Sequence, residues 1–159
     1  MEKINLVYNS EHCLGCHSCE IACAVAHSRA KTLREAIRET PPPPPRVRIV
    51  IGKKGENKAL RCQHCARPKC VEACSTGALT RDEETGLVSL DQDKCTLCLQ
   101  CIEACPFDAL YVIGEGEDDR MLVKCDLCVE RQERGLGPAC VEACPTRALA
   151  VRVKQPAKT

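Results

Sequence analysis

Aromatic residues are almost absent from this chain. Its 159 residues include no Trp, two Tyr and one Phe. Aromatic side chains normally supply much of the area that a core buries, so a compact fold here needs another source of stability. Basic and acidic residues nearly cancel, 23 against 22. The net charge of +1 gives no bulk attraction to nucleic acid or to an anionic membrane, so no nucleic-acid partner is expected.

The chain also has few of the segments that target or anchor a protein. Residues 1–11 contain no apolar stretch of secretory length and no twin arginine, and no segment approaches the ~20 apolar residues of a transmembrane helix. We therefore expect no membrane insertion and a reducing, cytoplasmic location. No nucleophile elbow, zinc-protease helix or phosphate-binding glycine loop is present. The chain is not expected to be an enzyme on its own.

Cysteine is the residue in excess, with 16 among 159 residues and no thiol outside a group. A disulfide scaffold would need a secreted chain, which the N-terminus does not favour. The first and third of the four groups read C-x2-C-x2-C-x3-C, the run that ligates [4Fe-4S] clusters in bacterial ferredoxins. The groups are Cys13/Cys16/Cys19/Cys23, Cys62/Cys65/Cys70/Cys74, Cys95/Cys98/Cys101/Cys105 and Cys125/Cys128/Cys140/Cys144. They predict four [4Fe-4S] clusters, whose binding supplies folding free energy.

The sequence repeats itself around these groups. Residues 71–79, 102–110 and 141–149 are three versions of one segment, each expected to form a short helix that ends in a cysteine and leads into a strand. The expected hairpins pair 79–80 with 86–90 and 110–113 with 121–124, the latter across a solvated acidic turn at 115–119, and a last strand covers 148–153. These features predict an α+β fold with short helices and β-hairpins around the metal sites.

The stretch after the first group departs from this plan. Residues 24–39 place Ala26, Ala30, Leu33 and Ile37 at helical spacing, which predicts one additional amphipathic helix. Five prolines at 41–45 must then be extended, as a surface spacer or as an arm that docks on a partner. A strand over 46–51 with a turn at 52–57 is expected to follow.

The spacing within a group indicates that the groups work in pairs. Three thiolates of the C-x2-C-x2-C-x3-C run wrap one cubane, and the fourth lies one helical turn further on, where a short helix can give it to a second cluster. Spacing alone leaves two schemes open. The first group can pair with the second and the third with the fourth, or the pairing can be nested.

From Cys13 to Leu149 the chain resembles the four-cluster iron-sulfur subunits of molybdenum and tungsten pterin oxidoreductases, such as formate dehydrogenase and dimethyl sulfoxide reductase. Compact subunits of carbon monoxide dehydrogenase, hydrogenase and tungsten aldehyde oxidoreductase complexes are similar. The specific marks are the four-residue gap before Cys70 and the eleven-residue gap before Cys140. Two positions depart from the pattern, because Ala24 and Ser75 stand where proline follows the fourth cysteine.

The resemblance implies nested pairing, with the outer groups sharing two clusters and the inner groups two. The implied ligand sets are Cys13, Cys16, Cys19 and Cys144 (first set), Cys23, Cys125, Cys128 and Cys140 (second set), Cys62, Cys65, Cys70 and Cys105 (third set), and Cys74, Cys95, Cys98 and Cys101 (fourth set). It also implies one polyferredoxin unit over residues 1–159 made of two bacterial-ferredoxin-like modules. The outer module takes 1–39 and 125–159, the linker or arm 40–57, and the inner module 58–124.

The predicted function is electron transfer. One cluster is enough to store one electron, so four clusters in one small chain indicate that electrons pass from cluster to cluster. The chain would conduct electrons between a catalytic subunit of the kinds just named and a flavin- or NAD-linked or other accepting subunit, and self-stacking of copies would lengthen the path. The alternatives are a free-standing multi-cluster ferredoxin and, more remotely, a zinc-binding scaffold. Zinc usually takes separated C-x2-C pairs, whereas three cysteines within seven residues suit a cubane.

Other residues near the cysteines have expected supporting roles. The four histidines are expected at the surface or beside ligands and not as ligands themselves. They are His12, His17, His27 and His64. Five cations near cysteines are hypothesised to raise cluster potentials, which depend on nearby charge. They are Arg61, Arg67, Lys69, Lys94 and Arg147.

Overall fold

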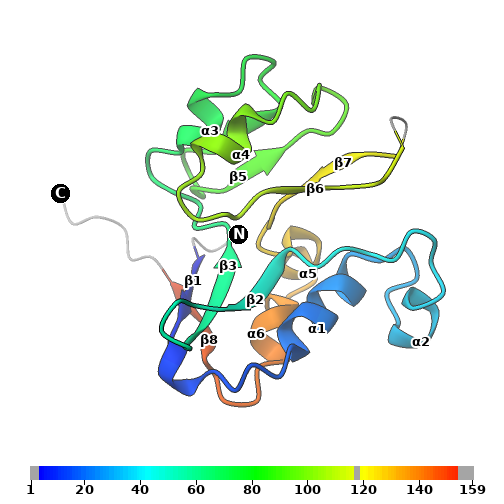
Figure 1. Cartoon of the computed structure of the whole chain (residues 1–159), viewed down its shortest axis with the longest axis vertical. Helices are drawn as coiled ribbons and strands as arrows, with labels where there is room; N and C mark the ends of the chain where they lie inside the picture. The colour runs from blue at the N-terminus through cyan, green and yellow to red at the C-terminus, as the bar shows by residue number, and fades with distance from the viewer. Residues whose placement is uncertain (1–3, 117–118, 154–159) are drawn as a thin grey trace.

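The computed structural model describes residues 4–116 and 119–153, which form short helices and paired strands (Figure 1). The first half holds β1 (Ile4–Tyr8), a 3-10 turn η1 (Ser10–His12), α1 (Ser18–Ala26), α2 (Leu33–Ala36), β2 (Val47–Ile51), β3 (Asn57–Arg61) and α3 (Lys69–Glu72). The second half holds β4 (Leu79–Arg81), β5 (Val88–Leu90), α4 (Gln100–Ala104), β6 (Tyr111–Ile113), β7 (Met121–Val123), α5 (Val129–Glu133), α6 (Ala139–Glu142) and β8 (Leu149–Val153). The predicted α+β class is confirmed.

Every strand that the structure describes belongs to a two-stranded antiparallel sheet. The hairpins β4–β5 and β6–β7 confirm the two predictions from the repeats, with Leu79 opposite Leu90 and Tyr111 opposite Val123. Part of the acidic turn expected at 115–119 lies outside the described residues. The predicted last strand, β8, pairs with β1, a partner that the sequence analysis did not anticipate. This pairing places segments from the two ends of the chain side by side (Figure 1).

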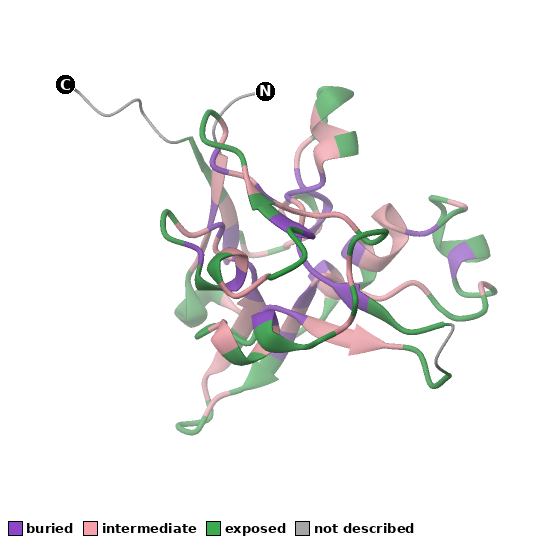
Figure 2. Ribbon diagram, turned by 90° about the horizontal axis from the view of Figure 1, so that it is seen from above, coloured by how far each residue is buried: buried purple, intermediate pink, exposed green. Residues whose placement is uncertain are grey.

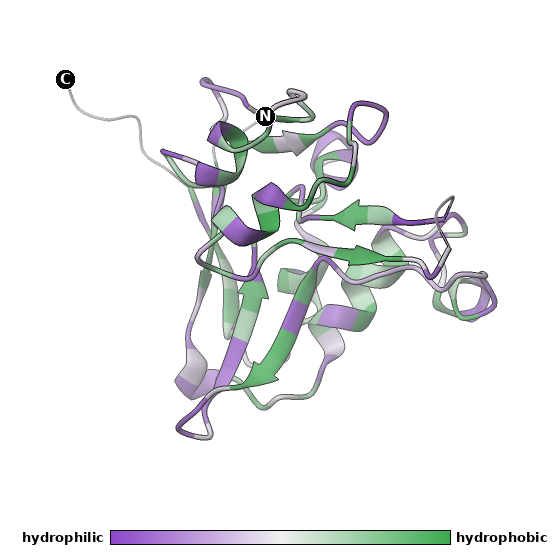
Figure 3. Cartoon of the chain, turned by 45° about the horizontal axis from the view of Figure 1, so that its top comes forward, coloured by the Kyte–Doolittle hydropathy of each residue, from purple (hydrophilic) through white to green (hydrophobic). Residues whose placement is uncertain are grey.

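Among the described residues, the apolar interior forms two clusters of buried residues, and cysteines contribute to both. One gathers Leu6 of β1, Val47 of β2 and Leu149 of β8 with cysteines that include those of the helices α1 and α6. The other gathers Leu79 and Val88 with cysteines of α3 and α4. Figure 2 shows buried residues where strands and helices meet, and Figure 3 shows hydrophobic residues along the paired strands. The interior is therefore assembled around the cysteine groups.

The segment expected as a linker, 40–57, contains β2, which contacts α1 and pairs with β3. Of the five prolines, Pro41 and Pro42 are exposed, whereas Pro45 accepts a hydrogen bond from the Tyr111 hydroxyl of β6. The guanidinium of Arg48 lies 4.4 Å from the centre of the Tyr111 ring, at the range of a cation–π contact. The proline run thus ends against β6, and the division of the chain into modules stays a prediction.

The single helix predicted over 24–39 is wrong. Helix α1 ends at Ala26, and only the four residues of α2 are helical further on. The Ser28 hydroxyl donates to the Val25 carbonyl and accepts from the Lys31 amide, and the Ala30 amide donates to a Glu39 carboxylate oxygen. These side chains bond the backbone groups that a continuous helix would use, which explains the break.

Within the described residues, no helix is long and apolar enough to cross a membrane.

Candidate iron-sulfur centres

Half of the sixteen cysteines lie on, or just after, two pairs of packed helices. Helix α1 packs against α6, and α3 packs against α4. In each pair, both helices place two cysteines about one turn apart, so that each helix can supply thiols to two neighbouring sites. The cysteines concerned are Cys19 and Cys23 on α1, Cys140 and Cys144 on and after α6, Cys70 and Cys74 on and after α3, and Cys101 and Cys105 on and after α4.

Two cavities each collect four cysteines from two different groups. The first is lined by the first set, Cys13, Cys16, Cys19 and Cys144, with apolar walls that include Ile49 and Leu149. The second is lined by the fourth set, Cys74, Cys95, Cys98 and Cys101, with Leu79, Leu90 and Leu122. In both, three thiols come from one group and the fourth from its nested partner.

The other eight cysteines form two further groups of neighbouring thiols. Burial raises the pKa of Cys140, and the nearby thiols of Cys125, Cys23 and Cys128 raise it further. Burial likewise raises the pKa of Cys65, with further contributions from Cys62 and Cys105. For Cys70 the pKa rises to about 11, from burial first and then from Cys62. Cys140 therefore lies near Cys23, Cys125 and Cys128, and both Cys65 and Cys70 lie near Cys62 and Cys105.

The donor chemistry of these sites fits iron-sulfur clusters. Burial raises the pKa of Cys125 to about 12, so its thiolate is unstable at neutral pH without a nearby cation. Iron bound by Cys125 would supply that charge and displace the thiol proton. All-sulfur donor sets favour iron-sulfur clusters or zinc, and four thiols arranged around one cavity suit a cubane better than a single ion.

Backbone amides point at several of the sulfurs. The Arg46 amide donates to Cys23 Sγ at 3.1 Å, and the Leu79 and Leu127 amides donate to Cys74 and Cys125 Sγ at 3.4 Å. Hydrogen bonds of this kind to cluster sulfurs raise reduction potentials, because they stabilise the added negative charge. The structure thus supplies amide donors to the second and fourth sets.

The cysteine loops hold non-glycine residues in left-handed backbone conformations. His17, Leu97, Leu99, Leu127 and Cys128 have φ between 53° and 66° and lie within the cysteine groups. Such conformations are uncommon for these residue types and persist where surrounding interactions demand them. They help to curl the loops of the first, third and fourth groups so that successive thiols converge, and residue propensity does not signal these positions because none of the five is a glycine.

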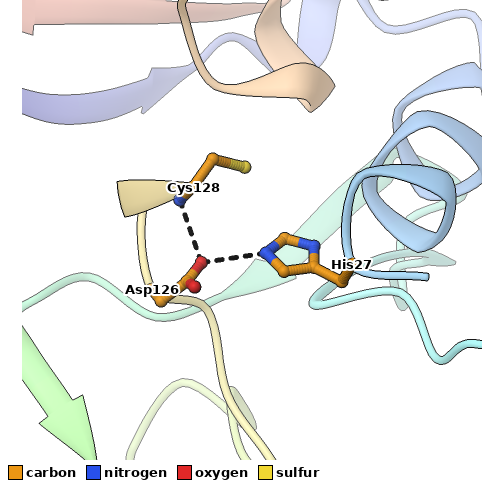
Figure 4. Close-up of side chains that lie close together, drawn as sticks. All are labelled: His27, Asp126 and Cys128. Carbon is orange, nitrogen blue, oxygen red and sulfur yellow. Dashed lines mark hydrogen bonds and ion pairs between the residues drawn. The ribbon is translucent and has the colours of Figure 1, made fainter. Parts of the chain in front are cut away.

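A partly buried ionic network lies beside the second set (Figure 4). His27 Nε2 lies 3.0 Å from Asp126 Oδ1, which also accepts from the Cys128 amide at 2.9 Å, and Arg46 pairs with Asp126 Oδ2 at 2.6 Å. Burial opposes protonation of His27, but Asp126 and the thiols of Cys128 and Cys23 raise its pKa to about 11. Although burial raises the pKa of Asp126, His27 and Arg46 hold it well below its usual range.

The atoms of His27, Asp126 and Cys128 are close enough together to bind a single metal ion. However, the Asp126 carboxylate already has two cationic partners in His27 and Arg46, and Cys128 belongs to a candidate cluster set. We therefore interpret the group as a support that holds the Cys128 loop against α1.

Replacing Asp126 with Asn is expected to destabilise the cluster-loaded protein by about 1–3 kcal/mol, because it leaves the partly buried side chains of His27 and Arg46 without a charged acceptor. Thermal unfolding under anoxic conditions measures the effect. Asp93→Asn, at an exposed position, is the matched control and should change stability by less than about 0.5 kcal/mol. Equal stabilities for the two variants would contradict the role of the network.

The histidines occupy different environments. His12 and His17 are exposed, and His17 pairs with Glu20. His27 lies beside Cys23, and the buried His64 accepts a hydrogen bond from the Val88 amide at 3.0 Å. Sequence reasoning missed Asp126 and Arg46 because their partners are distant in the chain. It also missed the buried Lys124, although its position directly before Cys125 offered a signal.

Comparison with known proteins agrees with iron-sulfur chemistry at these cysteines. A family model described as a 4Fe-4S dicluster domain matches residues 56–154, and one described as a 4Fe-4S binding domain matches residues 10–26. A protein of Rhodospirillum rubrum named iron-sulfur protein is 39% identical over 157 residues, which cover 93% of this chain and 81% of that protein.

Two further relatives have more specific names. The electron transport protein HydN of Escherichia coli K12 is 35% identical over 158 residues, covering 91% of this chain and 85% of that protein. A protein of Salmonella typhimurium named as a subunit of tetrathionate reductase is 32% identical over 145 residues, covering 87% of this chain and 53% of that protein. The chain therefore belongs to the 4Fe-4S dicluster family of iron-sulfur electron-transfer proteins.

Proposed function

We propose that the chain is a linear four-cluster electron relay, with ligand sets in the order first, second, third, fourth. Helix α1 carries cysteines of the first and second sets, and α6 with the residues just after it does the same; α3 and α4, each with the residues just after it, carry cysteines of the third and fourth. The thiols of Cys125 and Cys62 are close enough to influence each other electrostatically, which links the second set to the third. When bound, each cluster supplies one-electron redox chemistry.

The single observation that carries this proposal is the gathering of cysteines across groups in the two described cavities. In the first cavity Cys144 meets three cysteines more than 120 positions earlier in the chain. In this relay the polypeptide holds the four sites at fixed spacing and shields the second and third sets from water. Both terminal sets include an exposed cysteine, Cys16 and Cys98, whereas all four cysteines of the second set are buried. Electrons would enter and leave at the exposed ends.

The proposed partner is a catalytic oxidoreductase subunit, of molybdenum or tungsten pterin, carbon monoxide dehydrogenase or hydrogenase type, with a flavin- or NAD-linked or other subunit as acceptor. The similarity to a protein named as part of tetrathionate reductase supports membership of such a complex. We also propose a cytoplasmic location, where a reducing environment keeps thiols available for iron. A free-standing carrier is the second candidate, favoured by the similarity to HydN over most of its length.

The test is anoxic purification of the natural complex, with iron, zinc and acid-labile sulfide analysis of this chain. We expect sixteen irons per chain, four for each of four cubanes. Native mass spectrometry should find the chain bound to a catalytic subunit. A lone monomer that passes electrons between separate enzymes would select the carrier, and a colourless zinc protein without labile sulfide would reject both.

A further inference from the structure

Two buried cations lie where the second and third sets meet. Arg61 is 4% exposed and Lys124 is 5% exposed, which is rare for charged side chains. Each stands directly before the first cysteine of its group, Arg61 at the end of β3 before Cys62 and Lys124 just after β7 before Cys125. The two related positions, in separate halves of the chain, converge on the same two ligand sets.

Neither cation has an acidic partner among the residues that the structure describes. The ion pairs found there involve neither Arg61 nor Lys124. Lys124 Nζ donates to the carbonyls of Val88 and Cys125, the latter at 2.7 Å. These acceptors satisfy hydrogen bonds of the ammonium group but do not neutralise its charge. A buried charge without a counter-charge is strongly unfavourable, so another anion is needed here.

Arg61 is similarly placed. Its Nη2 donates to the Leu6 carbonyl at 2.5 Å and its Nη1 to the Cys62 carbonyl at 3.4 Å. Its buried Nε has no hydrogen-bond partner among the described residues. Burial lowers the pKa of Arg61, and the nearby thiolates of Cys125, Cys140 and Cys62 oppose that effect. The groups near Arg61 that would carry negative charge as cluster ligands are therefore cysteines of the second and third sets, and Cys62, Cys125 and Cys140 lie in one buried cluster.

The surroundings of Lys124 show the same arrangement. Burial raises the pKa of Cys65, Cys70 and Cys125, and in each case the charge of Lys124 opposes the rise. Each cation thus interacts electrostatically with cysteines of both the second and the third set. The other four cations named from the sequence differ, because Arg67, Lys69, Lys94 and Arg147 are all exposed. Water screens charges at such positions, so they have little effect on buried sites.

We propose that Arg61 and Lys124 are tuning residues whose counter-charges are the two central clusters, and that they make those clusters the first to be reduced. Four thiolates give a cubane a net negative charge, and accepting one electron makes it one unit more negative. The donor cluster would be oxidised by losing that same electron, and no bond or proton would move. Because the cations are held in the interior before the electron arrives, they stabilise it there, and the centre of the relay stores electrons between the exposed ends.

This inference rests on the proposed four-cluster relay, and its test separates the two. Arg61→Gln and Lys124→Gln are compared with the charge-retaining Arg61→Lys and Lys124→Arg and with the exposed control Arg67→Gln. Iron and labile sulfide are measured first in each loaded protein. If the unmodified chain holds fewer than sixteen irons, the proposed four-cluster relay is wrong, whatever the two cations do. Redox titration of the holoprotein monitored by electron paramagnetic resonance then measures the potentials.

Each glutamine variant at Arg61 or Lys124 is expected to disfavour reduction of the central clusters at least tenfold, a fall of about 59 mV for one electron. The charge-retaining variants should recover most of that loss, and Arg67→Gln should leave the titration unchanged. Unaltered midpoints in loaded Arg61→Gln and Lys124→Gln proteins overturn the proposal, as does an equal shift in Arg67→Gln.

A second measurement applies even if the glutamine variants fail to load. Cys16→Ser and Cys98→Ser change one exposed ligand in each terminal set and should alter the signals of terminal clusters alone. In the unmodified protein, the signals that appear first on reduction should be those that neither serine variant alters. If the first signals are the altered ones, electrons enter the terminal clusters first and the proposal is wrong.

Discussion

Removal of iron is expected to unfold most of this protein. Eight of the sixteen cysteines are buried, and they are part of both apolar clusters. The few aromatic residues leave little else to fill the interior, and without iron the four central thiols of the second set become a poorly packed group. The loss should equal the whole unfolding free energy of a domain, about 5–15 kcal/mol. Circular dichroism and amide hydrogen exchange before and after chelation measure it.

The control for this experiment is reconstitution. Adding iron, sulfide and a thiol reductant to the chelated chain should restore both the visible absorption and the protected amides. A chain that keeps its exchange protection after complete iron loss would show that the strands and helices are stable by themselves. In that case the clusters would bind to a fold that is stable without them, and would not form its core.

Cys140→Ala is expected to have a far larger effect than Cys16→Ala, although each removes one ligand. Cys140 is 4% exposed on α6. Without it the cluster is incomplete, and the negative charge of the three remaining buried thiolates is not fully neutralised by iron. Leaving a buried charge unpaired costs on the order of 3–5 kcal/mol. Cys16 is exposed, so water or an added thiol can complete its site at a cost of less than about 1 kcal/mol.

Thermal unfolding and iron content of the two variants under anoxic conditions measure this difference. For Cys140→Ala we also expect electron transfer between the ends of the relay to cease, because the proposed order puts the second cluster between the first and the third. End-to-end reduction by a low-potential donor, followed with an acceptor dye, tests this. Similar iron content, stability and current in both variants would contradict the linear order of the sets.

Local patterns predicted the hairpins well. The repeated segments that end near Leu79, Leu110 and Leu149 each lead into a strand, because a turn follows the cysteine and alternating apolar residues follow the turn. The helix predicted for 24–39 was wrong for an equally physical reason. Apolar spacing cannot detect that the side chains of Ser28 and Glu39 bond the backbone in place of the helix.

The sequence by itself determined the chemistry of this protein, since sixteen thiols at these short spacings suit iron-sulfur clusters whatever the surrounding fold. It also determined the short-range elements, which depend on residues a few positions apart. Only the tertiary structure decided which cysteines from distant groups share a cavity, that β1 pairs with β8, and that Arg61 and Lys124 are buried between two sets. Such contacts join residues far apart in the chain, and their geometry follows from packing and burial, which local spacing does not encode.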